Sequence, residues 1–186
     1  RVLHNRGPDA SGHFEDATLA TGIYLDDFLG ADARNDVPGV YSFTSTFADF
    51  DRDGHADLAI AADFQTSQLF WNNGDSTFTK APRPYEDHGS GIGTDENGMG
   101  SAIADFNGDG LLDWFVTSID DELSVCSQGP CIWGDSGNRL YLNNGDRTFS
   151  DVTDQYGVRD GDWGWGAAFF DYDNDGDLDL TMTNGW

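Results

Sequence analysis

The chain has 186 residues, and its 34 acidic residues against 9 basic ones give a formal net charge of −25 at pH 7. A surface with this charge repels nucleic acid and anionic lipid, so neither is expected as a partner. Hydrophobic residues make up 38% of the sequence, which is enough for a folded core. No apolar run approaches the roughly 18 residues of a spanning helix, so membrane insertion is not expected.

Residues 1–41 predict half of a four-stranded unit, followed by a connector. Two short stretches, 2–7 and 13–16, are separated by Gly, Pro and Asp and favour a β-hairpin. We interpret this hairpin as a degraded form of one that recurs twice later in the chain. Residues 22–41 are rich in Asp, Gly and Pro and are predicted to form a surface connector.

Residues 42–99 predict a complete unit. Apolar stretches over 43–48, 58–62 and 69–72 predict three strands, and an acidic loop joins the first two. The turn Asn72-Asn-Gly-Asp75 needs residues that tolerate positive φ, and it predicts a hairpin into a fourth strand that ends near residue 80. Residues 81–99 are predicted to form a second surface connector.

Residues 100–163 repeat this order, with a second acidic loop and the turn Asn143-Asn-Gly-Asp146. An insert between the second and third strands holds Cys126 and Cys131, which predict either a small disulfide-closed loop or two free thiols. We favour the disulfide, because no Cys or His that could complete a metal site is near. Residues 164–186 predict a final half unit, in which a third acidic loop joins two strands.

The three acidic loops share a nine-residue pattern, with oxygen-bearing side chains at positions 1, 3, 5 and 9 and Gly at position 6. Alternate carboxylates around such a bend form a cage for a hard cation, and Ca²⁺ prefers oxygen ligands. We predict about three Ca²⁺ ions, each held by the four side chains and by the backbone carbonyl of position 7. The predicted ligands are Asp49, Asp51, Asp53, His55 and Asp57, then Asp105, Asn107, Asp109, Leu111 and Asp113, then Asp171, Asp173, Asp175, Asp177 and Asp179, with His55, Leu111 and Asp177 acting through their carbonyls.

Calcium explains the loops better than a metal-free turn or a different metal site. Asp, Asn and Gly also favour solvated turns without metal, but three copies in one phase and the repulsion between crowded carboxylates favour a cation. An EF-hand would need Glu at position 12, where Ile60, Val116 and Met182 stand in predicted strands. Mg²⁺ prefers octahedral sites that keep water, and zinc prefers nitrogen or sulfur ligands. The neutral Asn107 predicts a weaker second site.

Repeated four-stranded units predict an all-β fold of β-propeller blades, with strands A, B, C and D in each blade and the cation loops between A and B. The expected boundaries are 1–41, 42–99, 100–163 and 164–186. Together they make about three blades, whereas a closed ring needs about four to eight. We therefore expect a section of a longer polypeptide, with an open stack completed by neighbouring copies as the alternative.

These loops, followed by Asn-Asn-Gly-Asp-x-Thr-Phe, resemble the FG-GAP/VCBS repeat of integrin α-subunit propellers and bacterial surface proteins. The stretch Gly164–Leu180 is similar to bacterial members of the cartilage-acidic-protein-like, ASPIC/UnbV-associated group. The resemblance covers most of residues 40–186 and implies a seven-bladed propeller with Ca²⁺ loops on one rim. The chain departs from the family in being too short for such a ring.

Calcium loops and the favoured disulfide both indicate an extracellular, cell-surface or periplasmic location. The leading hypothesis is a non-enzymatic, calcium-binding module for adhesion, scaffolding or assembly, because no catalytic constellation is recognisable in the sequence. Its predicted partner is a protein or a glycan, other blades of the same longer chain, or neighbouring copies.

Two alternative functions stay open. The first is a carbohydrate-binding or carbohydrate-processing propeller, in which Trp163 and Trp165 would stack on sugar, although Trp165 corresponds to Met99 and favours packing between blades. The carboxylates available for catalysis would be those of the second connector, Glu86, Asp87, Asp95 and Glu96. The second is a subunit of a filament or larger complex, assembled through the exposed strand edges of the terminal half units.

Overall fold

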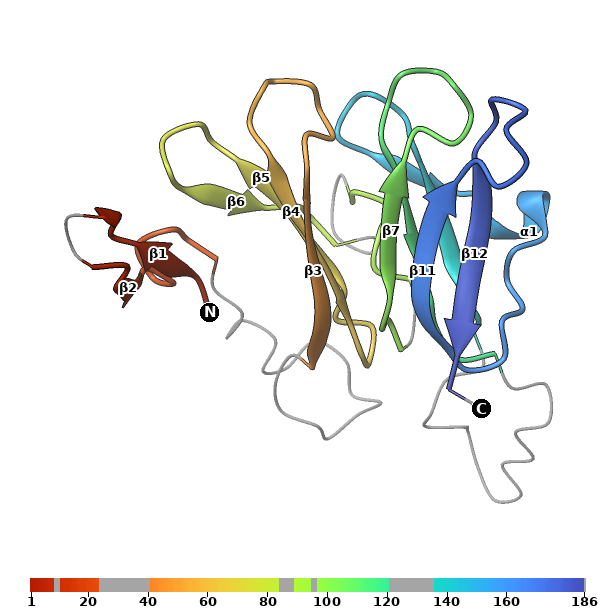
Figure 1. The fold of residues 1–186 in the computed structure, drawn as a ribbon, viewed down its shortest axis with the longest axis horizontal. Helices are drawn as coiled ribbons and strands as arrows, with labels where there is room; N and C mark the ends of the chain where they lie inside the picture. Colours follow the sequence, from red (N-terminus) through yellow and green to blue (C-terminus); the bar gives the residue numbers. More distant parts are fainter. Residues whose placement is uncertain (9–10, 24–40, 84–88, 95–96, 121–135, 186) are drawn as a thin grey trace.

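The computed structural model describes residues 1–8, 11–23, 41–83, 89–94, 97–120 and 136–185. These residues form twelve antiparallel strands and one helical turn, arranged in two four-stranded and two two-stranded sheets (Figure 1). The predicted all-β fold of four-stranded, propeller-like blades is therefore confirmed. In this part of the chain no helix has the length and apolarity needed to cross a membrane.

The sheets come along the chain as one two-stranded sheet, two four-stranded sheets and a second two-stranded sheet, which we call half units and complete units. The first half unit holds β1 (Leu3–Asn5) and β2 (Phe14–Asp16), and the first complete unit holds β3 (Ser42–Ala48), β4 (Asp57–Ala62), β5 (Gln68–Asn72) and β6 (Phe78–Lys80). The second complete unit holds β7 (Ser101–Ala104), β8 (Asp113–Val116), β9 (Arg139–Asn143) and β10 (Phe149–Asp151), and it is followed by α1 (Thr153–Tyr156). The last half unit holds β11 (Gly164–Phe170) and β12 (Asp179–Asn184).

Each complete unit is an up-and-down sheet, with strand orders β3-β4-β5-β6 and β7-β8-β9-β10. The second strand of each unit is buried along its whole length, because it lies inside the sheet and is covered on both faces. Each hairpin turn places positive φ where the sequence predicts it, at Gly74 and Gly145. Ser76 and Arg147, two residues further on, also have positive φ.

The first strands of successive units, β3, β7 and β11, lie side by side, and the sheets fan out from them (Figure 1). Hydroxyl side chains near these strands bond across the unit boundaries. Thr44 donates to the Met99 carbonyl at 2.7 Å, and Thr117 donates to the Trp165 carbonyl at 2.9 Å. Backbone bonds also cross these boundaries, from the Gly98 N–H to the Ala62 carbonyl at 3.0 Å and from the Gly164 N–H to the Ser118 carbonyl at 3.3 Å.

The hydrophobic core lies between the units. The largest cluster joins Leu69 and Trp71 of the first unit to Trp114, Tyr141 and Phe149 of the second. A second cluster packs the second unit against β11 and β12, and a third packs the first unit against residues near the N-terminal hairpin. A face of a sheet is therefore buried where a neighbouring unit, or the N-terminal segment, packs against it.

The prediction that residues 81–99 form a surface loop is wrong for the part that the structure describes. Ser90, Ile92 and Asn97 are buried, with exposed fractions of 1 to 3%. The Phe149 N–H donates to the Ser90 carbonyl at 2.7 Å, and the Thr94 N–H donates to the Tyr141 hydroxyl at 3.0 Å. The connector runs against the second unit because its polar backbone finds partners there. Residues 22–41 lie mostly outside the described part of the chain.

Candidate metal centres

Each acidic loop bends through two residues of positive φ, at positions 4 and 6. In the first loop these are Arg52, with φ of 60°, and Gly54, with φ of 88°. The second loop has Gly108 and Gly110 there, and the third has Asn174 and Gly176. Position 6 is Gly in every loop because its φ reaches 85° to 97°, a region that side chains disfavour.

The carboxylate at position 1 holds this bend by accepting backbone N–H groups across the loop. Asp49 accepts from Asp53 at 3.1 Å through Oδ1 and from Gly54 at 3.0 Å through Oδ2. The other two loops repeat the pair of bonds, Asp105 from Asp109 and Gly110, and Asp171 from Asp175 and Gly176. The acidic pattern therefore encodes the local fold as well as a ligand set.

In the first loop the structure brings together the carboxylates of positions 1, 3 and 9. One oxygen each from Asp49, Asp51 and Asp57 lies within 4.8 Å of the others. Asp171, Asp173 and Asp179 of the third loop form the same kind of group. In the second loop Asn107 takes position 3, so an amide replaces the carboxylate between Asp105 and Asp113.

The carboxylate at position 5 lies outside these groups and bonds to the loop itself. Asp53 accepts the N–H of His55 at 2.8 Å, and Asp109 accepts the N–H of Leu111 at 2.8 Å. In the second loop this backbone bond, followed by one from the Asn107 amide, lowers the pKa of Asp109. A cation that took position 5 as a ligand would share a carboxylate that already fixes the loop.

The closing carboxylate at position 9 is buried in both complete units. Asp57 is fully buried and accepts the N–H of Asn72 at 2.8 Å and that of Phe50 at 3.0 Å. Burial, with the nearby charges of Asp51 and Asp53, raises its pKa to about 6 despite these hydrogen bonds. Asp113 has the same setting and a pKa also raised to about 6. Asp179 has no third strand beside it in the described chain and is partly exposed.

Arginines from neighbouring segments contact the loops, and sequence reasoning missed them. Arg147, in the second unit's hairpin turn, donates from Nε to Asp51 at 2.8 Å and approaches Asp53 to 3.9 Å. Its guanidinium also lies 5.2 Å from the ring centroid of Trp71. Arg52 of the first loop donates to the Gly110 carbonyl of the second. In the sequence, these contacts are signalled only by the presence of Arg52 and Arg147 as single basic residues in otherwise acidic segments.

Asn143 joins the two complete units at this rim. Its side-chain amide donates to the Phe50 carbonyl of the first loop at 2.8 Å and to the Leu112 carbonyl of the second at 3.0 Å. Asn72 makes the bond within its own unit, to the Ala56 carbonyl at 2.9 Å. The Asn that opens each of these hairpin turns is thus also a support of the acidic loop.

The remaining predicted site residues are dispersed or lie outside the described part. Trp165, which the sequence predicts to pack between blades, meets the Phe43 ring of β3 edge-on at 6.2 Å and stays 44% exposed. Trp163 is 37% exposed. The predicted disulfide of Cys126 and Cys131, and the carboxylates Glu86, Asp87, Asp95 and Glu96, fall outside the described residues.

The donor set fits a hard cation. All the converging side-chain atoms of the first and third loops are carboxylate oxygens, which Ca²⁺ prefers and zinc does not. A buried carboxylate such as Asp57, crowded by Asp51 and Asp53, is stabilised by a nearby positive charge. Acidic clusters that can hold a metal ion are therefore present in this structure, in the loops where the sequence predicted them.

Two comparisons with known proteins bear on this arrangement. A family model described as an FG-GAP-like repeat matches residues 49–116 and 124–181, and these two ranges contain all three acidic loops. A search of curated proteins found no match.

Proposed function

This chain belongs to the family of FG-GAP-like repeats, and on that premise we propose that it is a non-enzymatic, Ca²⁺-stabilised repeat module for adhesion, scaffolding or assembly outside the cytoplasm. The observation that carries the proposal is the convergence of three carboxylates in the first loop and three in the third. The same geometry in two loops about 120 residues apart along the chain is hard to explain as chance placement of exposed acids.

In this proposal the side chains at positions 1, 3 and 9 of each loop hold the ion, and position 5 and the carbonyl of position 7 complete the shell. The bound ion supplies positive charge that offsets the mutual repulsion of the carboxylates. Because the loop joins strands A and B, its ordering holds the two strands in register. Calcium then stabilises the native state by its binding free energy, about 2.7 kcal/mol per site at a free concentration 100-fold above Kd.

The proposed location outside the cytoplasm follows from the loops, since sites of this kind suit compartments where calcium is abundant. The acidic surface, with a net charge of −25, also suits a partner that is cationic or that binds through calcium. A glycan partner is the second candidate. The half-exposed Trp163 and Trp165, both on or beside β11, are the aromatic surface that favours it.

The test is a thermal melt of the purified chain in calcium and in excess chelator, beside elemental analysis of bound metal. We expect about three Ca²⁺ per chain, a melting temperature that rises with calcium, and little effect of Mg²⁺ at equal concentration. Asp49→Asn and Asp171→Asn are each expected to remove one ion. Equal melting temperatures in calcium and chelator, with no bound metal, would show that the loops are acidic turns that bind no stabilising ion.

A further inference from the structure

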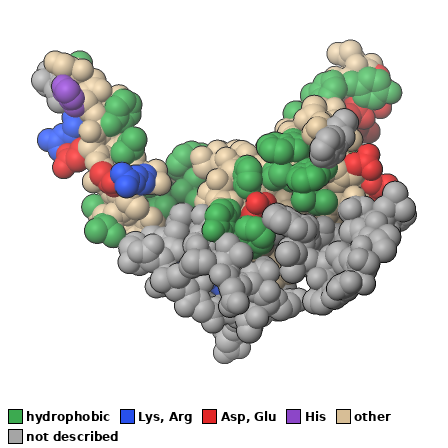
Figure 2. All heavy atoms as spheres, turned by 90° about the horizontal axis from the view of Figure 1, so that it is seen from below, with side chains coloured by type: hydrophobic (Ala, Val, Ile, Leu, Met, Phe, Trp, Pro, Cys, Tyr) green, Lys and Arg blue, Asp and Glu red, His purple; other side chains and the backbone are tan. Residues whose placement is uncertain are grey.

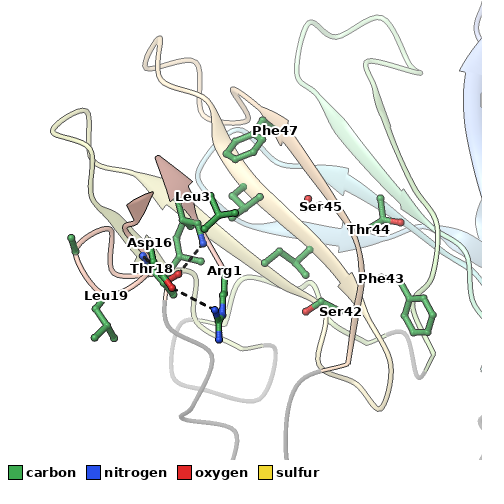
Figure 3. Close-up of a pocket in the computed structure, with 15 residues that line it drawn as sticks. Arg1, Leu3, Asp16, Thr18, Leu19, Ser42, Phe43, Thr44, Ser45 and Phe47 are labelled. Carbon is green, nitrogen blue, oxygen red and sulfur yellow. Dashed lines mark hydrogen bonds and ion pairs between the residues drawn. The ribbon is translucent and has the colours of Figure 1, made fainter. Parts of the chain in front are cut away.

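The described surface is apolar on one side and polar on the other. Seen from below, hydrophobic side chains gather between two arms (Figure 2), and a cavity of about 1020 Å³ opens between the N-terminal hairpin and β3, where Leu3 and Phe47 line it (Figure 3). The opposite rim carries the acidic loops and the hairpin turns, whose polar side chains are exposed (Figure 1). Reactions of the chain with water are therefore favoured at this rim.

Asn followed by Gly is the dipeptide most open to spontaneous loss of the side-chain amide. In this reaction the backbone nitrogen of the Gly attacks the side-chain carbonyl carbon of the Asn, and Gly favours the attack because it has no side chain to obstruct it. All Asn–Gly steps of the sequence lie within the described residues. There are five: Asn73-Gly74, Asn97-Gly98, Asn107-Gly108, Asn144-Gly145 and Asn184-Gly185.

In four of the five steps the fold binds the N–H of the Gly. The acceptors are side-chain or backbone oxygens at distances of 2.9 to 3.2 Å. A nitrogen whose proton is held in this way must break the hydrogen bond before it can attack, so the bond protects the Asn. The protected pairs are Gly74 with Asn72, Gly145 with Asn143, Gly98 with Ala62 and Gly185 with Trp163.

Gly108, at position 4 of the second acidic loop, is the exception. Its N–H has no hydrogen-bond acceptor among the described residues, and a Cβ built on it would meet nothing within 4 Å. The neighbouring Asn107 is exposed. Position 4 is Arg52 in the first loop and Asn174 in the third, so only the second loop combines Asn at position 3 with Gly at position 4. Both reacting groups are thus open at this step.

The side-chain amide of Asn107 is polarised by Asp109. The Asp109 N–H donates to Asn107 Oδ1 at 3.0 Å, and Asn107 Nδ2 donates to Asp109 Oδ2 at 2.9 Å. A donor on Oδ1 stabilises the negative charge that develops on this oxygen during the attack. Asn73 and Asn144 also accept a hydrogen bond on Oδ1, from hydroxyl groups. Polarisation is therefore shared by three steps, and the free N–H distinguishes Asn107.

We propose that Asn107 is a site of spontaneous deamidation, which the fold selects among the five Asn–Gly steps. The Gly108 nitrogen bonds to Cγ of Asn107, the Cγ–Nδ2 bond breaks, and ammonia leaves with the proton that the Gly108 N–H has lost. Water then opens the cyclic imide. Breaking the new N–Cγ bond gives aspartate, and breaking the original backbone C–N bond gives isoaspartate. Water is consumed and ammonia is released, and no atom is oxidised or reduced.

The aspartate product gives the second loop the acidic pattern of the other two. Position 3 is Asp51 in the first loop and Asp173 in the third, so deamidation replaces a neutral oxygen donor by a carboxylate. The effect on metal rests on the proposed function: calcium affinity rises with the charge of the ligand set, so the second site would strengthen as the protein ages. The isoaspartate product lengthens the backbone at the bend and is expected to weaken the site.

The first test follows deamidation of the native chain in mildly alkaline buffer with chelator, by peptide mapping and mass spectrometry. Asn73 and Asn144 are internal controls, because both are exposed and both continue with Gly-Asp, as Asn107 does. We expect Asn107 to react about tenfold faster than either, since breaking a hydrogen bond of about 1.4 kcal/mol costs that factor. In denaturant the three should react at similar rates. Native Asn73 or Asn144 reacting as fast as Asn107, or an Asn107 that reacts only in denaturant, would overturn the proposal.

The second test moves the reactivity to another turn. Asn72→Ala removes the acceptor of the Gly74 N–H, whereas Asn72→Asp keeps an oxygen there. Both variants lose the amide that donates to the Ala56 carbonyl, so they are matched in that loss. We expect deamidation of Asn73 to rise about tenfold in Asn72→Ala and to stay near its original rate in Asn72→Asp. Equal rates in the two variants would contradict the protective role of the hydrogen bond.

The third test separates this inference from the calcium proposal. Asn107→Asp reproduces the aspartate product, and Asp49→Asn with Asp171→Asn disables the other two loops. In that background we expect Asn107→Asp to lower the calcium Kd about tenfold. An unchanged Kd would overturn the predicted effect on the second site. No calcium binding with either residue at position 107 would refute the proposed function, while the deamidation rates would still decide whether Asn107 is the selected site.

Discussion

The Arg147 guanidinium supplies positive charge to the first acidic loop by pairing with Asp51. Removing this side chain should therefore tighten calcium binding at that loop. Its guanidinium bonds to Asp51 at 2.5 Å and 2.8 Å, and Asp51 is a proposed ligand whose side chain is only 8% exposed. Ser is the natural replacement, since Ser76 holds the equivalent turn position in the first unit with φ of 73°, close to the 66° of Arg147. Arg147→Ser therefore changes the charge beside the loop and leaves the turn intact.

The magnitude follows from charge and exposure. Two unit charges about 4 Å apart interact by about 1 kcal/mol in water and about 4 kcal/mol at an effective dielectric of about 20, and a divalent ion doubles these figures. Arg147 is about half exposed, so the lower figure applies, and the side chain can also swing into solvent at the cost of an exposed ion pair. We expect a net gain of about 1 to 2 kcal/mol, a roughly 5- to 30-fold lower Kd.

The assay is calorimetric titration with calcium in a background where Asp105→Asn and Asp171→Asn disable the other two loops. Arg6→Ser is the control, because it removes the same charge from an exposed pair with Glu15, away from the loops. In chelator, Arg147→Ser should be less stable by up to about 1 kcal/mol, since the ion pair and the stacking on Trp71 are lost. An unchanged or higher Kd would refute the view that Arg147 competes with the ion.

Further predictions concern burial at the loops and at the unit boundaries. In chelator, the raised pKa of Asp57 and Asp113 makes the native state bind more protons than the unfolded chain between about pH 4 and 6. The contribution of these two carboxyls to stability should therefore fall as the pH rises through that window. Denaturant unfolding at a series of pH values should show this fall, and saturating calcium should abolish it. Gly100→Ala would place a Cβ 2.0 Å from the Trp165 carbonyl oxygen, and we expect a loss of about 1 to 3 kcal/mol in chemical denaturation. Thr117→Val leaves the buried N–H of Gly100 without its 2.7 Å acceptor and should cost about 1 to 3 kcal/mol, whereas a change below about 0.5 kcal/mol would show that the inner strands do not depend on this bond.

Local features of this fold could be predicted from the sequence because their causes are local. Position 6 of each loop needs Gly for its φ, and position 1 needs a carboxylate to accept two nearby N–H groups, so the pattern itself carries the bend. The hairpin turns are equally local. The four-stranded units followed from these signals, and so did the groups of carboxylates at positions 1, 3 and 9.

Features that depend on contacts between units could not be predicted in this way. Arg147 and Asp51 are 96 residues apart, and only the packing of two blades brings them together. The buried part of the second connector has the Gly-rich composition of a surface loop, but its backbone bonds to Phe149 and Tyr141. Trp165 has the spacing of a buried residue and lacks a neighbour in the described chain that would bury it.

The amide of Asn143 couples the first acidic loop to the second. It holds a carbonyl from the first loop and one from the second, so neither loop can rearrange without moving a shared partner. If the loops bind calcium as proposed, ordering one loop by an ion would lower the entropy cost of ordering the other. Two separate cation sites would thereby become a cooperative pair, with a steeper response to calcium than independent loops would give.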